Sequence, residues 1–306
     1  MFAANSAVNT THPARAAVAI RLSRYLRRVD WLPLAIAFSL AAVIVPPLVK
    51  GLAESGFARE NYRGAQVAFP AGIAIPVVAL LALVPLSLIA ELADAEVFRP
   101  GTDAAVTYVI GVALLGLLDD LVGSDAPARG WRGHARAAAS GGLSTGAIKA
   151  VGSLGLALFA LSGTGTNTGE YLLAVGVLVL ATNLFNLLDL RPGRSAKALV
   201  LLGVALSLGA MDADPLWTLG LFLGPILVLL PLDLREVGML GDTGSNAIGA
   251  VAGLWLVLTL SVPAQAVALA VMAAVTVYGE FRSISAVIDR TPGLRHLDSL
   301  GRTSHA

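Results

Sequence analysis

The sequence has no cysteine, few histidines and few charged residues, and each shortage excludes a class of protein or site. Without cysteine, disulfides, thiolate metal ligands and cysteine nucleophiles are all excluded. The four histidines (His12, His134, His296 and His305) are too scattered to predict a histidine metal cluster. Charged residues make up 13% of the chain, whereas soluble domains carry about 25%. An ordinary soluble protein is therefore excluded.

The sequence consists mostly of long apolar runs. The chain has 306 residues, of which 56% are hydrophobic, and its mean hydropathy is +0.78. Apolar stretches of roughly 20 residues, enough to cross a ~30 Å hydrocarbon core, recur along it. We predict an all-α fold, a polytopic transmembrane helix bundle in the plasma membrane. About nine spans are expected, at residues 31–50, 71–92, 102–122, 140–162, 170–188, 196–210, 216–232, 244–262 and 264–283.

Small residues predict close helix packing in this single transmembrane domain, which we expect at residues 30–284. The chain has 32 glycines, and small residues let helix backbones approach one another in lipid. Gly249 and Gly253 form one such pair, four positions apart. A basic leader, residues 1–29, and a basic tail, residues 285–306, are expected on either side of the domain.

Basic residues collect in the loops of one side of the predicted array, and the positive-inside rule predicts that this side is cytoplasmic. The loops of the other side contain Arg99 alone. The leader disagrees, because nine spans place its five arginines outside; it forms an amphipathic surface helix, or one span is miscounted. The basic residues of the predicted cytoplasmic side are Lys50, Arg59, Arg63, Arg129, Arg132, Arg136, Lys149, Arg191, Arg194, Lys197, Arg235, Arg282, Arg290, Arg295 and Arg302.

Three segments with acidic or amide side chains also lie at span ends on that side. GLLDDLVG closes the third span, NLFNLLDLRPGRS closes the fifth, and MLGDTGSNAIG opens the eighth. In the second segment the polar residues recur every three positions, so they share one side of a helix. In the third, two glycines bracket the acid in a turn, and Thr243 or Ser245 can cap the helix that follows. The polar residues are Asp119, Asp120, Asn183, Asn186, Asp189 and Asp242.

Each segment alone has an ordinary structural explanation. Acids at span ends lie in the headgroup region, asparagines join helices by hydrogen bonds, and GDTGS is a common turn. Together, however, they bring three carboxylate-bearing segments to one face. Oxygen ligands of this kind suit Mg²⁺, and arginines on the same side can hold anionic groups. The pattern predicts phosphate chemistry between one substrate from the lipid and one from the cytosol.

The same segments resemble the signature segments of the polyprenyl-phosphate N-acetylhexosamine-1-phosphate transferases, glycosyltransferase family 4. The matches come in family order and at similar spacing, from about residue 30 to 290. NYRGAQVAFPAGIA, residues 61–74, also resembles the element that the family carries before its second span. The resemblance implies transfer of a sugar-1-phosphate from a UDP-N-acetylhexosamine to undecaprenyl phosphate. The cofactor would be Mg²⁺, the released product UMP, and the pathway cell-wall or surface polysaccharide synthesis.

The resemblance also implies a role for each matched residue. Asp119 would deprotonate or position the polyprenyl phosphate, Asp120 would support it or the metal, and Asp242 would bind Mg²⁺. Lys149 matches a lysine that contacts phosphate, although a snorkelling lysine at a span end explains it equally well. The nucleotide side would be lined by Asn183, Asn186 and Asp189.

Several positions depart from the family pattern. Gly123 stands where an Asp or Asn usually follows the aspartate pair, and Leu190 and Pro192 interrupt the expected Asp-Gly-x-Asp-Gly. Met239 replaces an aromatic that stacks on uracil, and His296 alone remains of a histidine-rich loop. The phosphate and metal side is thus retained, while the nucleobase side is not. An active enzyme is favoured over a relative that only binds polyprenyl phosphate.

Other classes of function have less support. A membrane transporter predicts ionisable residues near the bilayer midplane and an internal repeat, and the sequence has neither. Nucleic-acid binding is unsupported, because the arginines are dispersed over loops that also face anionic lipid. The donor sugar and the oligomeric state are not determined by the sequence.

Overall fold

Apolar helices make up most of the protein. The structure, a computed structural model, describes residues 29–123 and 145–302. The predictions made for the leader and for the loop with Arg129, Arg132, His134 and Arg136 lie outside these ranges, as do His12 and His305. The start of the fourth predicted run, residues 140–144, also lies outside the described ranges. Within them, each predicted apolar run coincides with a helix to within a few residues. The helices on these runs are α2 (Leu32–Glu54), α3 (Ala74–Leu92), α4 (Thr102–Val122), α6 (Thr145–Ala160), α7 (Thr168–Leu188), α8 (Arg194–Ala210), α10 (Gly220–Leu234), α11 (Gly241–Thr259) and α12 (Val262–Phe281).

The remaining elements are short. They are α9 (Asp214–Thr218), α13 (Ile284–Arg290), α14 (Pro292–Ser299), the single turn η1 (Ala71–Ile73) and two strands. The strands β1 (Ala58–Glu60) and β2 (Gln66–Ala68) pair antiparallel, with Arg59 opposite Val67. The prediction of an all-α fold is confirmed, with this hairpin as a small addition within the described chain.

Five helices of the described chain are long and apolar enough to cross a membrane. Helices α6 and α10 are apolar but shorter, and α11 opens with the polar residues of GDTGSN. The protein is therefore a polytopic membrane protein by the length and composition of its helices, while the total of nine spans stays a prediction. The five helices are α2, η1 with α3, α4, α7 and α12.

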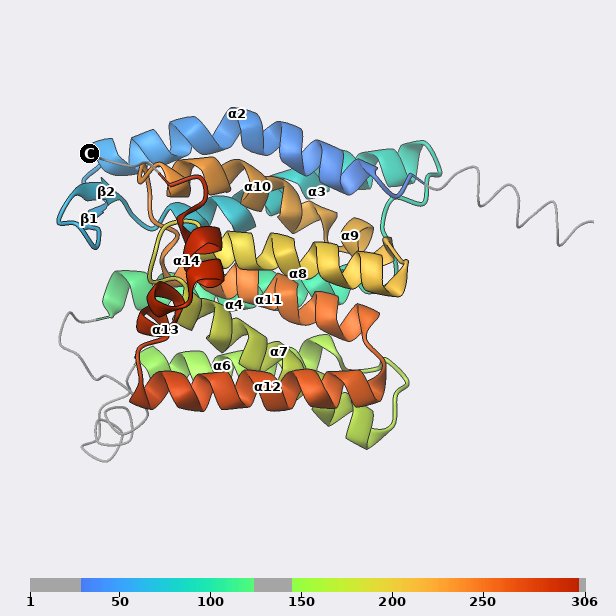
Figure 1. Cartoon of the computed structure of the whole chain (residues 1–306). Helices are drawn as coiled ribbons and strands as arrows, with labels where there is room; N and C mark the ends of the chain where they lie inside the picture. The colour runs from blue at the N-terminus through green and yellow to red at the C-terminus, as the bar shows by residue number, and fades with distance from the viewer. Residues whose placement is uncertain (1–28, 124–144, 303–306) are drawn as a thin grey trace, which may run out of the picture.

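Helix α11 lies in the middle of the bundle, packed against α4, α7 and α8 (Figure 1). Every residue of α11 from Thr243 to Leu256 is buried. The predicted glycine pair faces α7. A Cβ atom on Gly249 would lie 2.7 Å from the Thr182 Cα atom, and one on Gly253 would lie 3.1 Å from the Leu178 Cα atom. Only glycine allows the two helices to come this close.

The two ends of the bundle differ. Figure 1 shows β1, β2, α13 and α14 at the same end as the last turns of α4 and α7 and the first turns of α8 and α11, with α9 at the opposite end. At that opposite end Arg99 is buried and forms ion pairs with Asp30 (2.9 Å) and Asp214 (2.5 Å). Its charge is therefore balanced by carboxylates. The cytoplasmic orientation of the hairpin end stays a prediction.

Candidate functional site

Four of the residues singled out in the sequence meet at the hairpin end of the bundle. The Lys149 ammonium group donates to Asp119 Oδ2 (3.2 Å) and also to Asp242 Oδ2. Asn186 Nδ2 donates to the same Asp242 oxygen (3.3 Å). These residues come from α6, α4, α11 and α7, four helices separated along the chain. We refer to Asp119, Lys149, Asn186 and Asp242 as the lysine–carboxylate cluster.

Asn186 ties this cluster together in either orientation of its amide group. In one orientation its oxygen accepts from Ser245 Oγ (3.1 Å). In the other, its nitrogen donates to Ser245 and Asp242 (both 3.1 Å) and its oxygen accepts from Lys149 Nζ (3.0 Å). The second orientation satisfies more partners. Asn186 therefore bridges the basic and acidic members of the cluster.

Asp120 has a different environment from its neighbour Asp119. Its Oδ1 atom accepts from the Asp242 backbone N–H (2.9 Å), and its Oδ2 atom accepts from the backbone N–H (2.9 Å) and the hydroxyl group (2.6 Å) of Thr243. The side chain is buried. Asp120 therefore caps the first turn of α11 from α4, satisfying N–H groups that have no partner within a helix.

This cap differs from the predicted one. The sequence predicted that Thr243 or Ser245 would cap α11, but the helix already begins at Gly241 and makes no side-chain cap of its own. Gly241 has φ +69°, and a Cβ atom there would lie 2.7 Å from Asp120 Oδ2. The tight turn brings the N–H groups onto the Asp120 carboxylate, so Ser245 is left to bond with Asn186.

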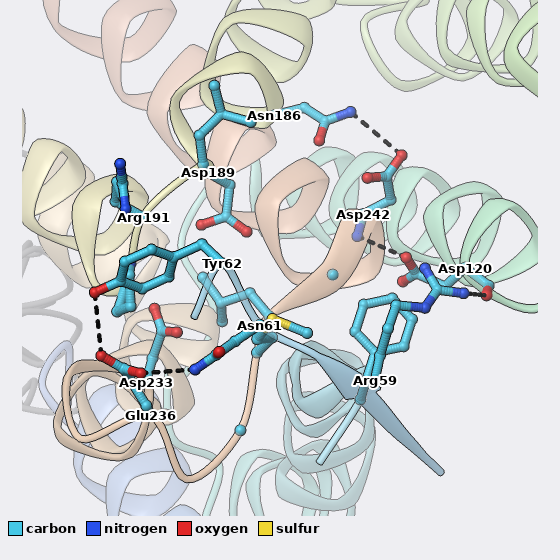
Figure 2. A pocket seen from close by; sticks show the side chains of 17 residues that line it. Arg59, Asn61, Tyr62, Asp120, Asn186, Asp189, Arg191, Asp233, Glu236 and Asp242 are labelled. Atoms are coloured by element: carbon cyan, nitrogen blue, oxygen red, sulfur yellow. Dashed lines mark hydrogen bonds between the residues drawn. The ribbon is translucent and has the colours of Figure 1, made fainter. Parts of the chain in front are cut away.

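A cavity of about 260 Å³ lies beside Asp242 and Asn186. Its volume is slightly below the ~300–1,000 Å³ of most ligand pockets. Figure 2 shows Asp189 across from Asp242, with Asp120 beside Asp242 and Arg59. Lys149 contacts both Asp119 and Asp242, but neither Lys149 nor Asp119 lines the cavity. The charged and aromatic lining of the described chain consists of Arg59, Tyr62, Phe69, Asp120, Asp189, Arg191, Asp233, Glu236 and Asp242.

Not all of the six polar residues predicted from the three segments line the cavity. Asn186 and Asp189 line the cavity, as the shared helix side predicted, but Asn183 is exposed and does not line it. Three residues correspond to 300° of helix rotation, so Asn183 is turned by about 60° from Asn186 around the helix and lies one turn further from the cavity.

Sequence reasoning missed the second half of the cavity. The Arg59 guanidinium lies 4.1 Å from the centre of the Phe69 ring and donates to the Asp120 carbonyl oxygen (3.2 Å). The Arg191 guanidinium lies 4.3 Å from the centre of the Tyr62 ring. Both arginines counted in the sequence only as loop charges. The available signals were the segment at residues 61–74, which contains Tyr62, and the unusual residues Leu190, Pro192 and Met239, which also line the cavity.

Glu236 organises that half of the cavity. It accepts from Asn61 Nδ2 (2.6 Å) and from the Tyr62 hydroxyl (3.3 Å), and it forms an ion pair with Arg63 (3.4 Å). Its backbone has φ +57°, a left-handed conformation that non-glycine residues seldom adopt. The hairpin is therefore tied firmly to the connection between α10 and α11.

The cavity lining is more acidic than basic. It contains five carboxylates and two guanidinium groups among the described residues. Partial burial, followed by the charge of the neighbouring Asp233, raises the pKa of Asp189 well above its usual range. A cation in the cavity would favour the charged form of Asp189 and would balance the excess of carboxylates in the lining.

The donor set suits one particular kind of metal site. Within the residues that the structure describes, no group of three His, Cys, Asp or Glu side chains is arranged to hold a metal ion by itself. Asp242 and Asn186 nevertheless present oxygen donors to a cavity with room for phosphate. Mg²⁺ commonly takes one or two carboxylates and completes its octahedron with water and substrate phosphate oxygens. These residues fit such an ion.

Comparison with known proteins finds no family model that matches the sequence and no curated protein that matches it.

Proposed function

We propose that this protein is a Mg²⁺-dependent membrane enzyme that transfers a sugar-1-phosphate from a nucleotide sugar, a UDP-N-acetylhexosamine, to a polyprenyl phosphate. The reaction would take place at the cytoplasmic face of the plasma membrane, in cell-wall or surface polysaccharide synthesis. The supporting observation is the lysine–carboxylate cluster beside a cavity at the end of an apolar bundle. A lipid-borne phosphate and a water-soluble diphosphate can both reach such a position.

In the proposed reaction, an oxygen atom of the polyprenyl phosphate attacks the phosphorus atom that carries the sugar. A new P–O bond forms there, and the bond from that phosphorus to the bridging oxygen of the donor breaks. UMP leaves with the bridging oxygen and its electron pair. Bound Mg²⁺ supplies neutralisation of the charge on the diphosphate, which is the main demand of phosphoryl transfer.

We assign a separate role in the reaction to each residue of the cluster. Asp242 and Asn186, which line the cavity, would orient the donor diphosphate and hold the ion. Asp119, which shares Lys149 with Asp242 but does not line the cavity, would position the acceptor phosphate and take its proton. Lys149 balances both carboxylates in the free protein and would turn toward phosphate when substrate binds. Asp120 acts through the backbone of Asp242 and is a positioning residue.

An assay of the purified protein in detergent tests this proposal. Undecaprenyl phosphate, Mg²⁺ and a panel of labelled nucleotide sugars are supplied, and release of nucleoside monophosphate is measured. We expect release that requires the metal, stops in Asp119→Asn and Asp242→Asn, and continues in the control Asp103→Asn. Asp103 is an exposed acid in the first turn of the same helix as Asp119, at the other end of the bundle.

Turnover that persists in both cluster variants would overturn the assigned roles. The alternative is a relative that binds polyprenyl phosphate without catalysis, and the ion pairs of Lys149 with both carboxylates favour it. If no donor is turned over while undecaprenyl phosphate still binds, the enzyme proposal is wrong and this alternative replaces it.

A further inference from the structure

The connection between α7 and α8 forms one wall of the cavity. Four consecutive residues, Asp189 to Pro192, line it. The connection ends at Gly193, which has φ +72° and lies so close to α10 that a Cβ atom would be 2.3 Å from Leu234 Cδ2. The Gly193 N–H group donates to Asp233 Oδ2 (2.7 Å). We call residues 189–193 the cavity loop.

The residue after this loop points away from the cavity and into the C-terminal segment. Arg194 is buried and donates from Nε and Nη2 to the two carboxylate oxygens of Asp298 on α14, at 2.8 and 2.9 Å. Its third nitrogen donates to Ser285 Oγ on α13 (2.9 Å). Two parallel bonds between a guanidinium and a carboxylate fix both distance and orientation.

Arg302 connects the same carboxylate to the cavity loop itself. Its Nη2 atom donates to Asp298 Oδ1 (2.7 Å), and its Nε atom donates to the backbone oxygen of Pro192 (3.0 Å). Burial alone would raise the pKa of Asp298, but the hydrogen bonds from Arg194 and Arg302 lower it to about 2. Asp298 is therefore charged at any physiological pH.

A lysine completes the attachment of α14. Lys197, one turn into α8, donates to the backbone oxygens of Leu297 (3.2 Å), Asp298 (2.5 Å) and Leu300 (3.1 Å). A cation at the carbonyl end of a helix is favourable, because those carbonyls have no partner within the helix. The C-terminal segment, expected from the sequence only as a basic tail, is thus docked on the first turns of α8.

We propose that Arg194, Asp298 and Arg302 form a clamp by which the C-terminal segment holds the cavity loop in its ligand-binding position. None of the three lines the cavity, so they are positioning residues. The inference goes beyond the proposed function, because the clamp acts on the cavity wall whatever ligand the cavity takes. A loop that must wrap a ligand binds it more weakly when it is not preorganised.

Hydrogen exchange of the full-length protein in detergent, followed by mass spectrometry, tests the clamp without any assumption about the ligand. The reporter is the peptide that contains residues 189–193, in which the Gly193 amide is bonded to Asp233. In Arg302→Met and Asp298→Asn we expect its exchange to accelerate by on the order of tenfold or more, as for loss of a charge-assisted hydrogen bond. Peptides from the buried helix α11 should not change, since only the loop is released.

The control is Arg295→Met, which removes an exposed arginine from the same helix α14. Unchanged exchange in the cavity loop of both clamp variants would overturn the proposal, as would equal acceleration in the control. If Asp298→Asn also accelerates hydrogen exchange in α11, that variant protein has unfolded more widely. The variant Arg302→Lys then tests the clamp. It keeps the charge but loses the guanidinium fork, and the cavity loop must then exchange faster than in the unaltered protein while α11 does not.

A second measurement applies once turnover is established. The clamp variants should raise KM for the nucleotide sugar and leave kcat nearly unchanged, because they act on the cavity wall and not on the lysine–carboxylate cluster. A fall in kcat with unchanged KM would contradict the clamp while leaving the proposed function intact.

Discussion

Asp119 and Asp120 are adjacent in sequence, yet the structure predicts opposite results when each becomes asparagine. The Asp120 carboxylate accepts three hydrogen bonds from the first turn of α11 and is 7% exposed. In Asp120→Asn, one carboxylate oxygen becomes an NH₂ group that faces a backbone N–H. Even in the better orientation, with the amide oxygen toward Thr243, the Asp242 N–H loses its partner.

The magnitude follows from the cost of such a defect. An unsatisfied buried donor costs about 1–3 kcal/mol, and loss of a helix cap costs about 0.5–2 kcal/mol. These two costs refer to the same hydrogen bonds and are not added. We therefore expect Asp120→Asn to lower the free energy of unfolding by about 2 kcal/mol and Asp120→Ala by more. Asp119 is a partly exposed member of an ion pair, and such pairs contribute about 0–1 kcal/mol.

Unfolding in detergent, monitored by loss of helical circular dichroism during titration with a denaturing detergent, measures both effects. Asp120→Asn should unfold earlier, and Asp119→Asn should unfold with the unaltered protein while losing turnover. Thr243→Val, which removes one of the three bonds, should have about half the effect of Asp120→Ala and should not add to it, because the two residues are partners. Equal stability of the Asp119 and Asp120 variants would refute the assignment of Asp120 as the cap of α11.

Three further predictions concern packing, ligand binding and pH. Gly249→Ala places a methyl group 2.7 Å from the Thr182 Cα atom and should lower the free energy of unfolding by about 1–3 kcal/mol; Gly155→Ala, where nothing lies within 4 Å, is the neutral control in the same denaturation assay. Arg191→Met removes the guanidinium from the Tyr62 ring and should raise KM for the nucleotide sugar on the order of threefold to thirtyfold, the equivalent of a cation–π contact, with kcat unchanged. Because the folded-state pKa of Asp189 is raised, its ionisation opposes folding, so stability falls as the pH rises from the ordinary carboxyl range toward the raised pKa. Asp189→Asn should weaken that fall and match the unaltered protein at more acidic pH, in unfolding measured across pH; a parallel pH dependence in both proteins would contradict the burial of this carboxyl.

Within the described residues, the pattern of apolar residues was sufficient to locate the nine long apolar helices, but not the short helices α9, α13 and α14. Hydrophobic runs identify the long helices because hydrophobicity and helix length are properties of neighbouring residues, and lipid requires every backbone group within it to be paired locally. The close approach at Gly249 and the meeting of Asp119 with Asp242 also agreed with the sequence. Both contacts depend on helices of similar length that lie side by side, because residues at the same height along such helices come together.

Only the tertiary structure decided which partner each polar side chain meets. Asp119 and Asp120 lie about 100° apart around one helix, so one faces Lys149 and the other the backbone of α11. Arg194 and Asp298 pair across 104 positions of the chain, and no local pattern relates them. Arg59 reaches the cavity from a hairpin, and Glu236 from the connection between α10 and α11, and the sequence predicted neither path. The sequence determines where the helices lie and how deep each residue is, because burial in lipid depends on neighbouring residues in the chain. Which partner a side chain meets depends on the helix that is packed against that side, and only the tertiary structure determines this.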